Sequence, residues 1–254
     1  LSVYSTIPYS DAEEKLSSIL TRHARHHTRK PQLLALSHKD DPAVEALRSF
    51  RTSMRFLLKT AENNVIILTG PSPGVGKSFA SANYAVVAAS DDARVLLIDA
   101  DMRKGHLYKA MGTRKAPGLS EWIAGDISID EVAREIDENV FFIPCGKKPP
   151  NPAELLASDS FQSLLKDTTD KFDLVIIDTP PILAVTDASI IAQYGGQLFV
   201  LIRSGQHRMN EITAAISRFE KDGVKVAGIL MNDAPLTEGY YSNKYAYTYH
   251  YQYR

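Results

Sequence analysis

One short segment constrains the fold of this chain more than any other feature. It reads Gly70-Pro-Ser-Pro-Gly-Val-Gly-Lys-Ser78, and it lies between an apolar run, residues 65–69, and a helical pattern that starts at Ser78. Glycines let backbone N–H groups curl around phosphate oxygens, and a helix N-terminus adds partial positive charge. The arrangement is typical of a Walker A loop, although the first glycine of the strict spacing falls at Pro71. We therefore predict a nucleotide phosphate site formed by Pro73, Gly74, Val75, Gly76, Lys77, Ser78 and Phe79.

Apolar runs continue along the chain and alternate with segments that are long enough for helices. The runs are rich in Val, Ile and Leu with little polar alternation, which predicts strands that are buried on both faces of a parallel sheet. The alternation predicts an α/β P-loop NTPase fold with a doubly wound, mostly parallel sheet, whose ligands bind at the carboxyl ends of the strands. The predicted strands are residues 65–69, 95–99, 140–144, 174–178, 198–202 and 226–231, and the main crossover helices are 78–90, 160–169 and 210–221.

The chain divides into three parts by composition. Residues 1–41 are interpreted as a lead-in or juxtamembrane segment that contains a basic, His-rich run at 22–30. A helix is predicted from Pro42 to about residue 60, capped by Asp41, and it begins the P-loop domain, residues 42–239. Residues 240–254 form a low-complexity tail with seven of the twelve tyrosines of the chain.

Composition excludes several classes of function. The net charge is −1, so the whole chain carries no electrostatic attraction to nucleic acid. The single cysteine, Cys145, rules out an intramolecular disulfide and fits a reducing compartment. No apolar stretch reaches the ~18 residues of a membrane span. The basic run at 22–30 is either a solvated linker or a contact for anionic lipid beside a membrane span upstream of the chain.

Three acidic residues follow predicted strands. Asp99 and Asp101 end the run Val-Leu-Leu-Ile-Asp-Ala-Asp, and Asp178 ends Leu-Val-Ile-Ile-Asp. A carboxylate at a buried strand end costs free energy of desolvation unless it is paired or lies near a metal. We predict that Ser78, Asp101 and Asp178 hold Mg²⁺ beside the phosphates of ATP. The alternative is that the three acids only cap the turns that follow them.

These motifs together resemble the deviant-Walker ATPases, which include the ParA/MinD partitioning proteins and the bacterial tyrosine kinases. Partitioning ATPases carry a signature lysine early in the loop, where this chain has Ser72. The segment from Asp99 to Gly105, the helical triad Glu45, Arg48 and Arg51, the segments 149–156 and 178–187, and the tyrosine-rich tail are similar to the bacterial tyrosine kinase family.

The resemblance implies an ATP- and Mg²⁺-dependent tyrosine autokinase, the cytoplasmic domain of an inner-membrane protein of exopolysaccharide or capsule export. Lys77 would neutralise phosphate charge, Asp99 would be the base, Asp101 would help to hold Mg²⁺, Arg103 would add charge near the acceptor or pair with an acid, and Asn232 would contact adenine. Glu45, Arg48 and Arg51 would join subunits of a ring-like homo-oligomer. The autophosphorylated residues would be Tyr240, Tyr241, Tyr245, Tyr247, Tyr249, Tyr251 and Tyr253, and a cognate tyrosine phosphatase would reverse the modification.

Several alternatives stay open from the residues. Glu45 and Arg48 also fit a solvated ion pair within one helix, and the alternating tail tyrosines also fit an edge strand. His106 stands where related kinases often have a regulatory tyrosine, and Tyr108 is either its substitute or an ordinary packing residue. Two other functions compete with the kinase: a partitioning-type ATPase switch, and an ATP-binding assembly module without kinase activity.

Overall fold

A computed structural model describes residues 1–22 and 30–235 of the chain. Within them, eight strands form one sheet in the order β1-β8-β7-β2-β6-β3-β5-β4. The strands are β1 (Val3–Pro8), β2 (Val65–Thr69), β3 (Val95–Asp99), β4 (Arg134–Asp137), β5 (Val140–Ile143), β6 (Leu174–Asp178), β7 (Gln197–Arg203) and β8 (Val226–Ala234). Every neighbouring pair is parallel except β4 and β5. The predicted doubly wound α/β fold is therefore confirmed.

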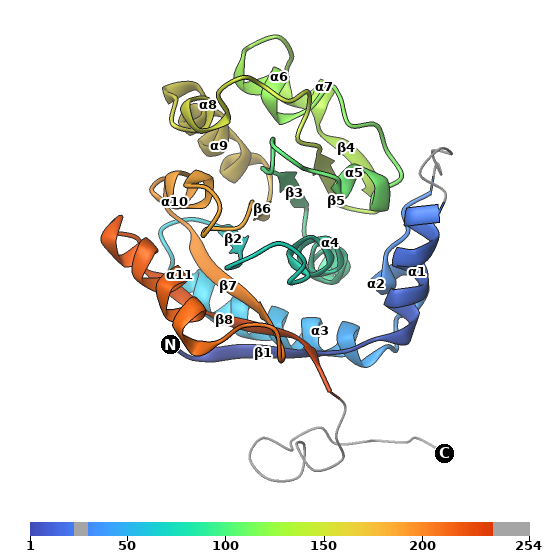
Figure 1. Ribbon diagram of the computed structural model, residues 1–254. Helices are drawn as coiled ribbons and strands as arrows, with labels where there is room; N and C mark the ends of the chain where they lie inside the picture. Colours follow the sequence, from blue (N-terminus) through green and yellow to red (C-terminus); the bar gives the residue numbers. More distant parts are fainter. Residues whose placement is uncertain (23–29, 236–254) are drawn as a thin grey trace.

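Helices flank this sheet on both faces (Figure 1). They are α1 (Asp11–Arg22), α2 (Leu34–Ser37), α3 (Pro42–Leu57), α4 (Lys77–Ala88), α5 (Leu107–Ala110), α6 (Leu119–Ile123), α7 (Ile129–Val132), α8 (Pro152–Leu156), α9 (Asp159–Lys171), α10 (Asp187–Ala192) and α11 (Met209–Lys221), with 3-10 turns η1 (Leu58–Thr60) and η2 (Ala89–Asp91). One apolar core includes buried residues of α2, α3 and α4, and the other includes residues of α6, α9, α10 and α11. None of the helices in the described ranges is both long and apolar enough to cross a membrane.

The central strands are buried along their whole length. Each residue of β2, β3 and β6 is buried, as expected for parallel strands with helices on both faces. The six runs predicted as strands all form strands, with ends that differ from the prediction by at most three residues. Their apolar composition is the reason, because such segments fit only where both faces of the sheet are covered.

Helix α3 starts where the sequence predicts. The Asp41 carboxylate accepts a hydrogen bond from the backbone N–H of Ala43 at 2.8 Å, and Pro42 occupies the first turn. On its buried face, the Phe50 ring lies 4.9 Å from that of Tyr84 in α4 and 5.2 Å from that of Phe199 in β7, measured between ring centroids. Helix α3 therefore fixes α4, the helix that follows the phosphate loop, against the sheet.

The interpretation of residues 1–41 as a lead-in misses three elements, β1, α1 and α2. Strand β1 pairs in parallel with β8 at the edge of the sheet, and α1 follows it. Tyr4 packs edge-on against Phe199 at 5.2 Å between centroids, and the Ser5 hydroxyl donates to the Ala46 carbonyl at 3.0 Å. The short, partly polar strand gives little signal in the sequence because its stability comes from β8 and α3. Strand β4, also absent from the prediction, is short and half-exposed.

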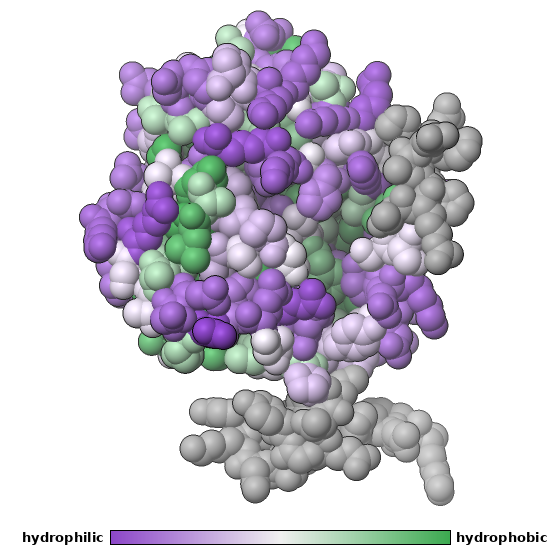
Figure 2. Space-filling model, in the orientation of Figure 1, coloured by the Kyte–Doolittle hydropathy of each residue, from purple (hydrophilic) through white to green (hydrophobic). Residues whose placement is uncertain are grey.

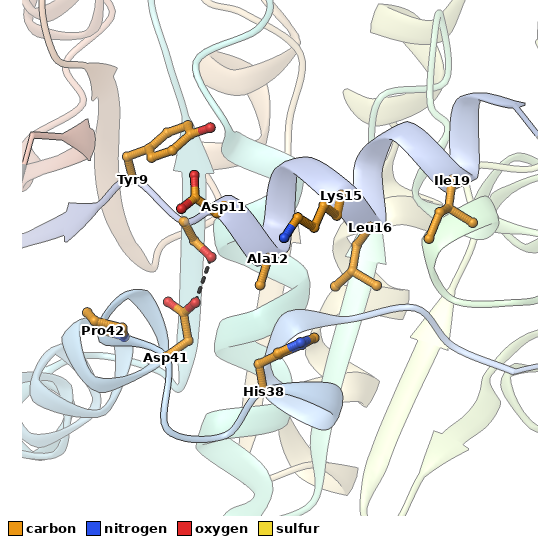
Figure 3. Close-up of a pocket in the computed structure, with 10 residues that line it drawn as sticks. Tyr9, Asp11, Ala12, Lys15, Leu16, Ile19, His38, Asp41 and Pro42 are labelled. Carbon is orange, nitrogen blue, oxygen red and sulfur yellow. Dashed lines mark hydrogen bonds between the residues drawn. The ribbon is translucent and has the colours of Figure 1, made fainter.

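A pocket of about 540 Å³ lies beneath α1, beside the start of α3. Figure 3 shows Ala12, Leu16 and Ile19 of α1 on the side of the helix that faces His38 and Asp41. The Ser10 hydroxyl donates to the Asp41 carboxylate at 2.6 Å, so the residue before α1 is joined to the residue before α3. No residue of the phosphate loop lines this pocket, so it is separate from the predicted nucleotide site.

Candidate nucleotide-binding and active site

The predicted site residues gather at the carboxyl ends of the central strands. The phosphate loop connects β2 to α4, and β2 lies between β7 and β6 in the sheet. Asp178 ends β6, and Asp99 ends the next strand, β3. Figure 1 shows β2, β6 and β3 around the start of α4. On the same face, Figure 2 shows a weakly polar centre bordered by hydrophilic side chains.

The phosphate loop adopts a backbone that requires glycine. Gly74 and Gly76 have φ of 79° and 92°, which other residues rarely adopt. A Cβ on Gly76 would also lie 2.1 Å from the Nδ2 atom of Asn232. The loop can therefore turn tightly into α4, which leaves the N-terminal N–H groups of that helix directed at a phosphate site.

Lys77 is the first residue of α4 and only 8% exposed. Burial lowers the pKa of its ammonium group, while the charges of Asp178 and Asp101 act in the opposite direction. A buried cation between a phosphate loop and two carboxylates is well placed to offset the charge of a bound phosphate chain.

Asp178 lies directly beside the start of α4. Its carboxylate accepts hydrogen bonds from the Ser78 hydroxyl at 2.8 Å and from the Ser81 hydroxyl at 3.1 Å. Burial raises the pKa of Asp178 to about 6, against the opposing influence of Lys77 and the two serines. The structure thus brings together Ser78 and Asp178, two of the three predicted metal ligands.

Asp99 is held at the deepest point of this group. It is 1% exposed and lies opposite Asp178 in the register between β3 and β6. Its carboxylate accepts from the backbone N–H groups of Asp101 at 3.2 Å and Leu107 at 3.3 Å. Burial, with the nearby charges of Asp178 and Asp101, raises the pKa of Asp99 well above its ordinary value. A carboxylate with a raised pKa is a stronger proton acceptor, which suits a general base.

Asp101 is half-buried and organises its own turn. Its Oδ1 atom accepts from the backbone N–H of Arg103 at 3.1 Å and of Lys104 at 2.8 Å. The turn-capping alternative therefore describes part of what this side chain does. Its charge also acts on both Asp99 and Lys77, so it belongs to the same electrostatic cluster.

Arg103 pairs with an acid, which is one of the two roles expected for it. Its Nε and Nη2 atoms donate to the two carboxylate oxygens of Asp187 at 3.0 and 2.9 Å. Asp187 is fully buried at the start of α10. The sequence offers Asp187 only as part of the segment that follows Asp178, and no pattern in it indicates this partner.

The ends of β7 and β8 border the phosphate loop on its other side. The Asn232 amide donates to the Val75 carbonyl at 3.1 Å, and its own Oδ1 atom is buried without a hydrogen-bond partner in the described ranges. An unsatisfied acceptor beside the loop fits a contact with a nucleotide base. The Ser72 hydroxyl lies 2.8 Å from His207 Nε2, a contact that the sequence does not signal.

The residues present fit a bound Mg²⁺ ion. Ser78, Asp101 and Asp178 supply oxygen atoms, the ligands that Mg²⁺ prefers, and the ion commonly keeps several water and phosphate ligands. Within residues 1–22 and 30–235, no three His, Cys, Asp or Glu side chains converge into a complete metal site. These residues can therefore form a metal site that has few protein ligands and lies next to a phosphate chain.

The remaining predicted residues make other contacts. Glu45 and Arg48 form an exposed ion pair at 2.8 Å, whereas Arg51 donates to the Val87 carbonyl at 3.2 Å and to the Ser90 hydroxyl, at the end of α4. Tyr108 is half-buried against an apolar core. The tail tyrosines and most of the basic run at 22–30 lie outside the described residues.

Comparison with known proteins places this geometry in a family. The profile of a family described as AAA domain matches residues 63–221. A solved structure, the BceF tyrosine kinase domain, is 42% identical with a TM-score of 0.84, and the match covers 92% of this chain and 94% of that one. The kinase domain of the Escherichia coli tyrosine kinase ETK is 38% identical with a TM-score of 0.85, over 98% and 95% of the two chains.

Curated relatives are longer than this chain. The tyrosine-protein kinase ptk of Acinetobacter johnsonii is 45% identical over 92% of this chain, which spans only 31% of that protein. The septum site-determining protein MinD of Pyrococcus horikoshii, bound to Mg-ADP, is 21% identical with a TM-score of 0.57 over 69% and 72% of the two chains, a likeness of fold alone. On the matches that cover nearly the whole of both chains, this chain belongs to the bacterial tyrosine kinase family, within the AAA domain proteins.

Proposed function

We propose that the chain is an ATP-dependent protein tyrosine autokinase that phosphorylates its C-terminal tyrosines in trans. The observation that carries the proposal is the convergence of Lys77, Asp99, Asp101 and Asp178 at one edge of the sheet, beside a phosphate loop. This edge supplies a cation for phosphates, oxygen ligands for a metal, and a buried carboxylate to accept a proton. The tail supplies the acceptors, because it contains seven tyrosines.

Each side chain has a defined task in this reaction. A tyrosine hydroxyl has a pKa near 10, so it needs a base, and Asp99 accepts its proton. Lys77 and the loop N–H groups stabilise charge on the transferred phosphoryl group. Ser78, Asp101 and Asp178 would hold Mg²⁺, which would neutralise charge on the phosphates. Asn232 contacts the adenine base through its unsatisfied carbonyl oxygen.

The proposal extends to assembly and cellular setting. Subunits form a ring-like homo-oligomer through Glu45, Arg48 and Arg51, so that each tail reaches a neighbouring site. Phosphorylation disperses the ring, and a cognate tyrosine phosphatase restores it. This cycle regulates exopolysaccharide or capsule polymerisation and export from the cytoplasmic side of an inner membrane, where the basic run at 22–30 contacts anionic lipid. Membership of the bacterial tyrosine kinase family supports the kinase activity on which this cycle depends.

Two rival functions make different predictions. A partitioning-type ATPase switch would hydrolyse ATP without modifying tyrosine, but Ser72 stands where its signature lysine is expected, and Ser72 contacts His207 of the same chain. An assembly module would bind ATP without phosphotransfer, yet a fully buried Asp99 costs free energy that binding alone does not require. Both observations favour the kinase.

Incubation of the purified chain with Mg-ATP separates the three functions. Released phosphate and phosphotyrosine are measured in the same sample. The kinase produces phosphotyrosine on residues 240–254, the switch produces free phosphate alone, and the assembly module produces neither. Free phosphate without phosphotyrosine would refute the proposal.

A further inference from the structure

The Arg103–Asp187 pair differs from the other ion pairs described for this chain. Asp187 is completely buried, and the side chain of Arg103 is about one third exposed. Both carboxylate oxygens are engaged in parallel contacts, 3.0 and 2.9 Å long. By contrast, the Glu45–Arg48 pair lies on the surface with both side chains more exposed. A two-point contact to a buried anion fixes the orientation of a guanidinium group.

The pair connects the two loops that carry the acidic cluster. Arg103 belongs to the turn after β3, which is closed by hydrogen bonds from the backbone N–H of Arg103 and of Lys104 to Asp101. Asp187 is the first residue of α10, which follows the loop that starts at Asp178. The turn is also joined to Asp178 by a hydrogen bond from the Ala100 N–H to the Asp178 carbonyl at 2.8 Å. The Arg103–Asp187 contact is the side-chain link between the turn and the chain that leaves Asp178.

The turn itself has little freedom to move within its surroundings. A Cβ on Gly105 would lie 2.5 Å from the Asp101 carbonyl, 2.6 Å from Cys145 Sγ and 2.7 Å from Asp99 Oδ2. The turn is thus packed closely against the buried carboxylate of Asp99. A change in the position of Arg103 would be transmitted directly to Asp101, because their backbone and side-chain atoms share a hydrogen bond.

We propose that Asp187 is a positioning residue, which holds Arg103 so that the Asp99–Asp101 turn keeps its place against Asp178. In this role Arg103 acts through the turn and does not contact the transferred phosphoryl group. If Arg103 turned toward phosphate, it would leave a fully buried carboxylate without its cation, an arrangement that proteins avoid. This inference rests on the proposed kinase function, but its structural part can be measured without catalysis.

The structural part is tested by hydrogen exchange on the full chain with Asp187→Asn, which preserves side-chain volume. We expect faster exchange at the N–H groups of Arg103 and Lys104, with unchanged protection in β2 and β6. Lys104→Ala, which removes an exposed neighbouring charge, should leave the turn protected. Unchanged exchange at Arg103 and Lys104 in Asp187→Asn would overturn the proposal, whether or not the chain phosphorylates tyrosine.

The catalytic part is tested by a double-mutant cycle on the phosphotransfer rate. Arg103→Ala, Asp187→Asn and the double variant should each lower kcat by about 10- to 100-fold, the cost of misplacing a reacting group, with KM for ATP unchanged. Because the two residues act as one unit, the double variant should be no worse than either single variant. Arg103→Lys should remain impaired, since an ammonium group cannot reproduce the two-point contact. Full activity in Asp187→Asn beside an inactive Arg103→Ala would instead show that Arg103 acts on the phosphate directly.

Discussion

The two buried carboxylates at the edge of the sheet, Asp178 and Asp99, have different environments, and so they should have different roles. Asp178 contacts the hydroxyls of Ser78 and Ser81, whereas the side-chain hydrogen bonds of Asp99 within the described residues come from backbone N–H groups. We therefore expect Asp178 to lie next to the nucleotide and metal, and Asp99 to lie next to the acceptor. Titration with a fluorescent ADP, with and without Mg²⁺, can separate these roles.

Asp99→Asn should bind Mg-ADP as well as the wild-type chain but lose phosphotransfer by about 10²- to 10⁴-fold, the usual contribution of a general base. Asp178→Asn should mainly weaken Mg²⁺-dependent binding, because it removes the negative charge and one carboxylate oxygen beside Ser78. Binding of ADP without Mg²⁺ is the control for both variants. Equal losses of Mg-ADP affinity in the two variants would contradict this division of roles.

At the scale of elements, a single side chain that joins two helices should contribute measurably to the stability of the fold. Arg51 of α3 donates to the carbonyl of Val87 near the C-terminus of α4, where helix carbonyls lack partners within the helix. The side chain of Arg48, one turn earlier, makes only an exposed pair with Glu45 in the hydrogen bonds and ion pairs described. The two arginines of one sequence motif therefore contribute to the fold to different degrees.

Arg51→Ala should destabilise the chain by about 1 kcal/mol, the net value of a hydrogen bond, and lower the melting temperature by about 2–4 °C. Arg48→Ala should cost less than about 0.5 kcal/mol, as surface ion pairs do. Thermal unfolding of dilute, phosphorylated protein, whose subunits should be separate, measures both without a contribution from assembly. Equal melting temperatures for the two variants would show that the Arg51 contact adds nothing to stability.

Helix α1 carries a group that makes stability depend on pH. Burial, together with the charges of Asp233 and Asp41, raises the pKa of Glu13 from its ordinary 4.5 to about 7. Folded Glu13 thus keeps its proton over a range where the unfolded chain has lost it. The resulting stabilisation is complete below about pH 4.5 and is lost as the pH rises through about 7.

Glu13→Gln should therefore stabilise the chain at pH 8 by about 1–2 kcal/mol, a value reduced for solvent screening of this half-buried carboxyl. At pH 4 the variant and the wild type should be equally stable, because Glu13 is then protonated in both states. Urea unfolding at the two pH values measures the difference, with the exposed Glu62→Gln as a control that should change neither. A variant that is no more stable at pH 8 would show that Glu13 ionises freely in the folded chain.

At the scale of the whole molecule, the sequence predicts what depends on local pattern. The buried runs of β2, β3 and β6 and the cap of α3 by Asp41 are visible in residue types alone. Strand β1 is not visible in residue types alone, because it pairs with β8, a strand at the other end of the sequence. The Arg103–Asp187 pair and the Ser72–His207 contact join residues far apart in sequence. Only the packed fold brings such partners together, so no local pattern indicates them.

Assembly should respond to the charge of the tail. Each phosphate adds about −1.5 to −2 charges, so a fully modified tail would gain roughly −10 to −14. Repulsion within a ring and loss of tail docking should favour separate subunits. Light scattering should give a larger mass for phosphatase-treated protein than for ATP-treated protein. The Arg48→Ala variant should have the smaller mass in both states. Identical masses, with phosphorylation verified by mass spectrometry, would defeat this coupling.

The central claim is that the phosphate-loop site of one subunit phosphorylates tyrosines in the tail of another. Wild-type chain labelled with ¹⁵N is mixed with unlabelled Lys77→Met chain and Mg-ATP, and mass spectrometry assigns each phosphopeptide to its parent. Lys77→Met removes the buried cation, so its rate of tyrosine phosphorylation without wild-type chain should fall by about 10²- to 10³-fold, as for the loss of one preorganised charge. The control is unlabelled Lys225→Met, at an exposed lysine, which should remain active without wild-type chain. In the mixture, phosphotyrosine should appear on residues 240–254 of the unlabelled Lys77→Met chain. Phosphotyrosine confined to the labelled wild-type chain, phosphotyrosine on neither chain, or full activity of Lys77→Met alone would contradict the claim.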